Sequence, residues 1–400
     1  MRSTGRRHAL TALLALAALV LCLGLAACGG GSSSSGSSSG SSESSGTESR
    51  EGTATTASDE GSGSSGSVPM PPTAPQKGIG VKTPLKSKPE ADKTVGWLQC
   101  SLPSCETFKG GFEKAAAALG WHVHTFVYES GKPGPAMQQA IDAGVDYIAI
   151  TGQPPALYEP QLKQAKAAGI PIISGNDTTP PNPAEGVYTQ FEDGRTYGKE
   201  AQQTVEWLLN KYEGEAQHIA YVTIADYPIL EAGYEYLQKT AEKYCSECST
   251  SEIVLTPEEL GAGKAPSKIV ATLQSDPEIN ALDFTVPDLL GGVGTALQSA
   301  GIEGVKMLGV AFGHSPEVLK GIESGEVSAW VAQPVSYEAW LMVDSMARLS
   351  EGMPLTEEHS ASVLPTWVID DPSAFKYLEP NQQWEGPPGF EGEFESLWGV

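Results

Sequence analysis

The chain has 400 residues, six cysteines and a formal charge of −24. A chain this acidic lacks the basic footprint that nucleic-acid phosphates require, so we exclude nucleic acid as a partner. The charge also disfavours broad contact with anionic lipid headgroups and favours solubility.

The first 28 residues have the pattern of an export signal. Three arginines precede an apolar run over 9–25, which is short for a membrane span. The run ends in Leu25-Ala26-Ala27-Cys28, which resembles the lipobox of bacterial lipoproteins. The resemblance implies a lipoprotein signal peptide over 1–27 and lipidation at Cys28. It places the chain at the cell membrane, lipid-anchored on the extracytoplasmic face. A plain secretory signal and an uncleaved anchor are the alternatives.

Residues 28–92 form the lipidated cysteine and a predicted linker rich in Ser, Gly and Pro. Little of the Ser/Gly stretch can be buried, so we expect it to be disordered. Up to Gln76 such a chain reaches roughly 40 Å, which suits a leash between an anchor and a folded body. A glycosylated stalk is the alternative interpretation. Loss of the signal arginines takes the formal charge from −24 to −27.

Four cysteines remain in the mature chain beyond Cys28, in two close pairs. Outside the cytoplasm they predict two disulfides, with local pairing as the simplest of three connectivities. A four-cysteine zinc site and a redox Cys-x-x-Cys are the alternatives. The expected pairs are Cys100 with Cys105 and Cys245 with Cys248.

After Lys93 the sequence alternates apolar strands with amphipathic helices. In the first half we expect strands at 94–99, 122–128, 146–151 and 170–174, and helices at 107–119, 133–143 and 155–168. The pattern restarts with strands at 218–223, 252–255, 281–286 and 306–310, and helices at 228–244, 264–273 and 288–300. Such alternation predicts βαβ units and parallel sheets. About 285 residues exceed one comfortable core, so we predict two similar α/β lobes, each with a doubly wound parallel sheet.

The predicted site lies where the strands end. Ligands of open parallel sheets bind outside the carboxyl ends of the strands, and two facing lobes would enclose one cleft. The amides, carboxylates and aromatic rings there suit a neutral polyol. Helix capping is the alternative role for Asn176, Asp177 and Asp288. The candidate ligand-binding residues are Gln99, Ser101, Glu106, Asn176, Asp177, Tyr227, Asp288, Phe312 and Gln333.

Catalytic signatures are missing from the sequence. It has no Gly-x-Ser-x-Gly, no His-Glu-x-x-His and no P-loop, and its six histidines show no metal spacing. We therefore expect no enzyme activity, no cofactor and no metal site.

From Lys93 to Leu378 the chain resembles the type I substrate-binding proteins of ABC transporters, the ribose- and galactose-binding group. The segments that carry the resemblance include "FKGGFEKAAAALGWHV", "MQQAIDAGVDYIAITGQPPALYEPQLKQAKAAGIPIISGND" and "AWLMVDSMARLSEGMP". The resemblance implies two lobes joined by three crossovers, near 187–190, 332–334 and 356–360. It implies an N-terminal lobe of 93–187 and 334–357, a C-terminal lobe of 188–333 and 358–378, and a C-terminal tail of 379–400.

The site departs from the ribose-binding pattern. Cys105 stands where an aromatic residue is usual, and Asn176-Asp177 replace an Asp-Arg pair. The arginine at the start of the second lobe's first helix is missing, whereas Gln333 is kept. A neutral or cationic solute is therefore favoured over an anionic one.

The resemblance implies a monomeric solute-binding lipoprotein. Its expected partners are a small-molecule solute, with carbohydrate favoured, the permease of an ABC transporter, and the membrane through the lipid anchor. The alternative function is a ligand-sensing input protein for a membrane receptor kinase.

Overall fold

The computed structural model describes residues 67–400, except 104, 192, 311–314 and 357–363. The predicted signal peptide, the lipidation site Cys28, the leash up to residue 66 and the candidate residue Phe312 lie outside the described residues. Within the described ranges, no helix combines the length and apolar character that a membrane crossing needs.

The first lobe is built on a five-stranded parallel sheet in the order β2-β1-β3-β4-β5. Side chains alternate between its two faces, so Val95 and Trp97 enter one core while Leu98 enters the other. The strands are β1 Thr94–Cys100, β2 His122–Tyr128, β3 Tyr147–Thr151, β4 Ile172–Gly175 and β5 Val187–Phe191.

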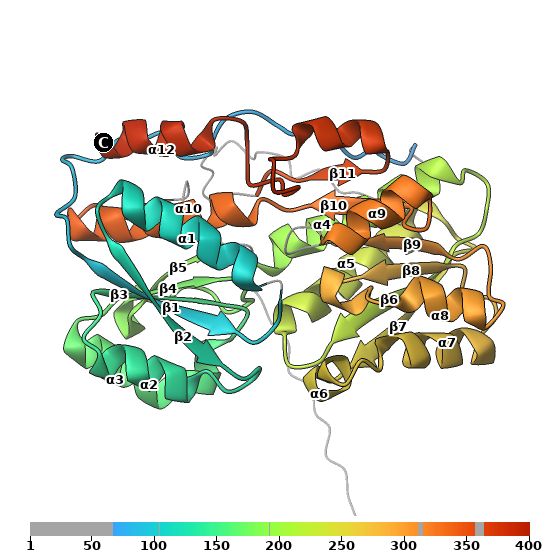
Figure 1. The fold of residues 1–400 in the computed structure, drawn as a ribbon, viewed down its shortest axis with the longest axis horizontal. Coiled ribbons are helices and arrows are strands. Elements are labelled where there is room, and N and C mark those ends of the chain that lie inside the picture. The colour runs from blue at the N-terminus through green and yellow to red at the C-terminus, as the bar shows by residue number, and fades with distance from the viewer. Residues whose placement is uncertain (1–66, 104, 192, 311–314, 357–363) are drawn as a thin grey trace, which may run out of the picture. The chain divides into compact units, whose positions relative to one another are not determined.

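Helices cover both faces of this sheet (Figure 1). α1 (Cys105–Ala118) and α10 (Val335–Ser350) pack on one face, with α2 (Gly134–Asp142) and α3 (Glu159–Ala168) on the other. α1 and α10 approach closely because Gly111 has no side chain; a Cβ there would lie 2.8 Å from Cα of Ser336. Short 3₁₀ turns η1 (Pro155–Tyr158) and η2 (Pro183–Glu185) complete the lobe.

The second lobe has a six-stranded sheet in the order β11-β10-β9-β8-β6-β7. Its strands run parallel except β11, which pairs antiparallel with β10 at the edge. The strands are β6 His218–Ile224, β7 Ser249–Leu255, β8 Ala281–Phe284, β9 Lys306–Gly309, β10 Ala329–Ala332 and β11 Trp367–Ile369.

Helices of the second lobe surround one hydrophobic core. Figure 1 shows them on both sides of the sheet. They are α4 Gly194–Lys211, α5 Pro228–Tyr244, α6 Pro257–Gly261, α7 Ala265–Ser275, η3 Pro287–Leu289, α8 Val293–Ser299, α9 Pro316–Ser324 and η4 Pro372–Tyr377. The prediction of two doubly wound α/β lobes with parallel sheets is confirmed.

The segment 67–92 differs from the predicted disordered linker. Near its start, the carbonyl of Pro72 accepts a hydrogen bond from Val368 N at 2.7 Å, on the second lobe. Further on, Ile79 and Val81 are buried in the first lobe's core. The few apolar residues of this segment are enough to pack it on the surfaces of the lobes, although it forms no helix or strand.

The C-terminal tail also spans both lobes. Trp384 is buried in the second core, while α12 (Phe390–Trp398) packs against α10 in the first. Near the end of α12, Leu85 N donates to Leu397 O at 2.9 Å, so the two terminal segments touch each other. The chain therefore passes between the lobes at both terminal segments, in addition to the passages between the sheets.

At two of the points where the chain crosses between the lobes, the boundary falls later in the sequence than expected. β5 continues in the first sheet to Phe191, beyond the expected boundary at 187. Leu364 packs in the first core, beyond the expected boundary at 357. The second passage lies at Gln333 and Pro334, between β10 and α10.

Both cysteine pairs form local disulfides, Cys100–Cys105 and Cys245–Cys248. Their Cα atoms are 5.9 Å and 5.3 Å apart, within the usual range for a disulfide.

Candidate functional site

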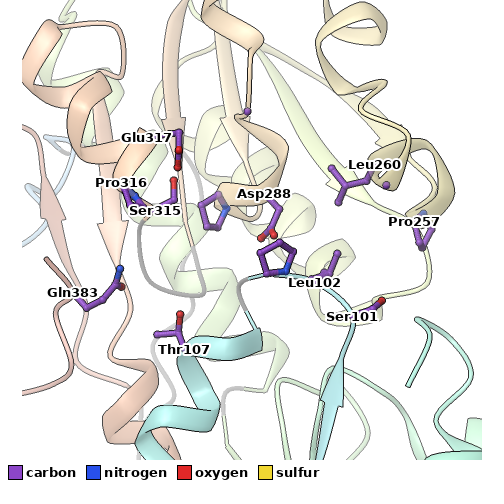
Figure 2. Close-up of a pocket in the computed structure, with 14 residues that line it drawn as sticks. Ser101, Leu102, Thr107, Pro257, Leu260, Asp288, Ser315, Pro316, Glu317 and Gln383 are labelled. Atoms are coloured by element: carbon purple, nitrogen blue, oxygen red, sulfur yellow. The ribbon is translucent and has the colours of Figure 1, made fainter. Parts of the chain in front are cut away.

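A cavity of about 580 Å³ lies between the two lobes (Figure 2). This volume falls within the range of small-molecule pockets. We call it the interlobe cavity. The described residues that line it are Ser101, Leu102, Pro103, Thr107, Pro257, Leu260, Gly261, Pro287, Asp288, Gly291, Ser315, Pro316, Glu317 and Gln383.

The first lobe contributes the loop after β1 and the start of α1. The helix begins with backbone hydrogen bonds from Cys105 N to Leu102 O and from Glu106 N to Pro103 O, both 3.1 Å. The Cys100–Cys105 disulfide ties the end of β1 to the first residue of α1. The disulfide therefore fixes both ends of the loop whose residues Leu102 and Pro103 line the cavity.

The second lobe contributes three segments that follow its strands. Pro287 and Asp288 belong to η3, just after β8. Thr256 begins α6 after β7 with a capping box, in which its side chain and that of Glu259 bond to each other's backbone N–H. Ser315 caps α9 by accepting from Val318 N at 3.3 Å. Each cap fixes the first helical turn that faces the cavity.

Acidic and hydroxyl groups provide the polar part of the wall. Asp288 and Glu317 are the ionisable residues among the described lining, and none of that lining is basic. Serine, threonine and glutamine side chains add neutral donors and acceptors, and four prolines and two leucines make the apolar part. Within the described ranges, no group of three or more His, Cys, Asp or Glu is arranged to hold a metal ion.

Next to the cavity the two lobes are in direct contact. A Cβ on Gly152 of the first lobe would lie 3.2 Å from the ring of Tyr227, which belongs to the second. Gly152 also has a φ of +72°, which favours glycine. Tyr227 is 5% exposed, and burial raises the pKa of its hydroxyl. Only about 10 Å³ of free space remains around this contact, bordered also by Cys100, Cys105 and Val286.

Several predicted ligand residues are buried at the strand ends of the first lobe. Asn176 follows β4 with a left-handed φ of 51°, and neither polar atom of its amide has a hydrogen-bond partner among the described residues. Asp177 accepts from Thr179 N at 3.0 Å, and burial raises the pKa of its carboxyl. Buried polar groups without a partner and left-handed backbone conformations cluster at functional sites.

The nine predicted ligand residues separate into groups. Ser101 and Asp288 line the interlobe cavity. Gln99 donates to Glu106 at 2.6 Å, and Glu106 lies 3.9 Å from the ammonium of Lys109. The remaining described ones do not line the cavity: Asn176, Asp177 and Gln333 are at most 3% exposed, and Tyr227 closes the contact beside it.

Other lining residues were not predicted. Pro257 and Leu260 follow β7, a strand end that the same rule would have singled out. Glu317 lies in the first turn of α9, where no candidate residue was predicted. Gln383 comes from the tail, where no strand pattern points to a site.

Comparison with known proteins places the chain in a family. The family model described as a periplasmic binding protein domain matches residues 102–354. No functionally curated protein is similar enough in sequence to count as a match.

Solved structures share the fold at low sequence identity. A carbohydrate transporter from Acidothermus cellulolyticus, in complex with myo-inositol, is 21% identical with a TM-score of 0.60, covering 70% of this chain and 95% of its own. The 5-methylthioribose transporter solute-binding protein of Thermotoga lettingae is 16% identical with a TM-score of 0.62. The match covers 80% of this chain and 99% of that protein.

The same fold occurs outside transport. A protein from Bacteroides fragilis assigned as a LacI transcriptional regulator is 10% identical with a TM-score of 0.60, covering 72% of this chain and all of its own. At these low identities the structural likeness shows the fold alone. The family model matches more than half of the chain and therefore shows the family. The chain belongs to the family of periplasmic binding protein domains, with the type I fold.

Proposed function

We propose that the protein is an extracytoplasmic solute-binding lipoprotein that captures a small polar solute in the interlobe cavity. The observation that carries the proposal is the cavity itself, because its walls come from both lobes. A solute bound there contacts both lobes and favours the arrangement that brings them together, which is a population shift driven by differential affinity.

A carbohydrate or sugar derivative suits the chemistry of the cavity. Hydroxyls, carboxylates and an amide pair with sugar hydroxyls, while prolines and leucines cover apolar C–H faces. The structures with the same fold include proteins in complex with myo-inositol and with 5-methylthioribose. The acidic wall disfavours an anionic solute.

The delivery step rests on the sequence. Cys28 and the Ser/Gly leash would hold the folded body near a membrane permease of an ABC transporter, to which the solute is handed. Cys28→Ala should release the protein from the membrane fraction or leave it unprocessed. Equal membrane retention of the variant and the wild type would exclude this anchor.

A thermal-shift screen tests capture. The panel contains myo-inositol, 5-methylthioribose, D-arabinose and D-glucuronate as the anionic comparison. A ligand at 100 times its Kd stabilises the native state by about 2.7 kcal/mol, which raises Tm measurably. Asp288→Ala should lower affinity for the same compound roughly tenfold. A panel in which no compound moves Tm, or in which glucuronate alone does, contradicts the proposal.

A further inference from the structure

The side chains that line the interlobe cavity are unevenly distributed over it. Figure 2 shows Leu102, Pro257 and Leu260 on one side of the cavity and Thr107, Ser315 and Glu317 on the other, with Asp288 between them. Ser101 lies on the side of the leucines, and Pro316 lies beside Ser315. We call the part of the wall formed by Leu102, Pro257 and Leu260 the apolar end. The cavity therefore offers hydrogen-bonding groups mainly at one end and hydrocarbon at the other.

The apolar end is built by both lobes. Leu102 follows β1 of the first lobe, whereas Pro257 and Leu260 belong to α6 of the second. Both leucines are partly buried and pack against the core of the second lobe. Their remaining surface borders the cavity. A group bound at the apolar end therefore contacts both lobes.

The position of Leu260 is fixed by its neighbours in α6. The carboxylate Oε2 of Glu259 accepts from Lys268 Nζ at 2.8 Å and from Thr256 N at 3.1 Å. The backbone N–H of Leu260 donates to Thr256 O, and that of Lys264 donates to Glu259 O, both at 3.0 Å. These bonds use the backbone of Leu260 and the side chains of other residues. The apolar end is therefore formed before a solute binds, so binding loses little entropy in ordering it.

The size of the cavity points to a solute larger than a bare sugar. A volume of about 580 Å³ is in the range of pockets that bury drug-sized ligands, whereas a hexose has only about 12 non-hydrogen atoms. A hydroxyl placed at the apolar end would lose its hydrogen bonds to water without gaining a partner from the leucines. An aliphatic group placed there would leave water at no such cost.

We propose that the solute is a sugar or polyol derivative that carries a short aliphatic group, with the hydroxyls at the polar end and the aliphatic group between Leu102 and Leu260. This inference rests on the proposed function, since it specifies the class of solute for the same cavity. The aliphatic group contacts one leucine from each lobe, so it strengthens the closed arrangement as well as the affinity.

The test compares sugars with and without such a group on the mature wild-type chain. Calorimetric titration uses methyl and n-butyl β-D-glucopyranoside, which differ only in the length of the alkyl chain, and D-ribose with 5-methylthioribose. Each buried methylene group strengthens binding about fourfold. We therefore expect the substituted member to bind at least about tenfold more tightly than its parent in one pair or both.

Two variants locate the preference in the cavity. Leu260→Ala and Leu102→Ala should each lower the affinity ratio of the preferred pair at least about threefold, because they remove hydrocarbon from the apolar end. Leu157→Ala is the matched control, since Leu157 is an exposed leucine of η1 that does not line the cavity. It should keep the ratio of the wild type. A loss of stability affects both members of a pair equally and cancels in the ratio.

The outcomes separate this inference from the proposed function. If a compound of the screening panel binds but neither substituted sugar binds more than twofold more tightly than its parent, the inference is overturned and the proposed function stands. A ratio that is unchanged in both Leu260→Ala and Leu102→Ala would also overturn it, because the preference would then arise elsewhere. If neither these sugars nor the panel raises Tm, the proposed function fails and the inference falls with it.

Discussion

The buried ion pair of α10 offers a sharp test of how the terminal segments are held. Arg348 is 1% exposed, and its Nε donates to Asp344 Oδ2 at 2.7 Å. A terminal nitrogen of the same guanidinium donates to Thr83 O at 2.6 Å, while Trp398 Nε1 donates to Asp344 Oδ1 at 2.7 Å. The pair of Arg348 and Asp344 therefore holds both the segment 67–92, through Thr83, and α12, through Trp398.

Arg348→Met should destabilise the chain strongly. The variant keeps the buried carboxylate of Asp344 but loses the opposite charge, and removing one partner of a buried pair costs about 3–5 kcal/mol. The carbonyl of Thr83 also loses a charged donor, for about 1 kcal/mol more. We expect a total loss near 4–6 kcal/mol in the free energy of unfolding.

Urea denaturation of the mature chain, followed by tryptophan fluorescence, measures this loss from the shift in midpoint. The double variant Asp344→Leu with Arg348→Met is the matched control, because it removes both charges. It should recover about 2 kcal/mol relative to Arg348→Met alone. A loss below 1 kcal/mol for the single variant, or an equal loss for the double one, would refute the reasoning.

Three further predictions concern a carboxyl, a disulfide and a glycine. Burial raises the pKa of Asp283 to about 7, from an ordinary 3.8. Between about pH 4 and 7 the folded chain keeps a proton that the unfolded chain releases, so stability should fall by roughly 4 kcal/mol as pH rises. Asp283→Asn should remove this slope in melts at several pH values, and an unchanged slope would contradict it. Replacing Cys245 and Cys248 with serine should cost about 2 kcal/mol by urea titration, since the closed loop is short; no loss would mean that the bond is not formed. Gly152→Ala brings a methyl group against Tyr227 at a left-handed φ, so the lobes should approach less closely. Small-angle scattering should then show a larger radius of gyration than for the wild type, and equal radii would argue against it.

Much of the fold could be predicted because the strands are regular. The strand expected at 94–99 is β1, and the helix expected at 228–244 has the same bounds as α5. Parallel strands that are buried on both faces appear in the sequence as short apolar runs bounded by Gly and Pro, so they can be predicted from it.

Residues 67–92 and the edge strand β11 could not be predicted in the same way. Residues 67–92 and the three-residue strand β11 bury few side chains each, so their sequences show no period of 2 or 3.6. Their positions depend on surfaces that exist only after the lobes have folded, as for Ile79 against the first core.

The candidate site was predicted in part for a related reason. Sequence places Ser101 and Asp288 at strand ends, and both line the cavity. It does not show how far each strand end lies from the boundary between the lobes. Asn176 and Gln333 are buried and do not line the cavity.

The hydrogen bond between Leu85 and Leu397 joins the two terminal segments of the folded body. A flexible Gly/Ser bridge from Val400 back to residue 67 could link the ends while Ile79 and Val81 stay in the first core, and new ends could be opened elsewhere, for example at Gly214, which is exposed with a φ of +83°. In such a circular permutant the order of the lobes along the chain changes while their cores stay the same. A reporter domain fused at the new ends would then sit on the second lobe, near the start of the segment 67–92, because Asn210 of α4 donates to the carbonyl of Pro69 at 2.9 Å.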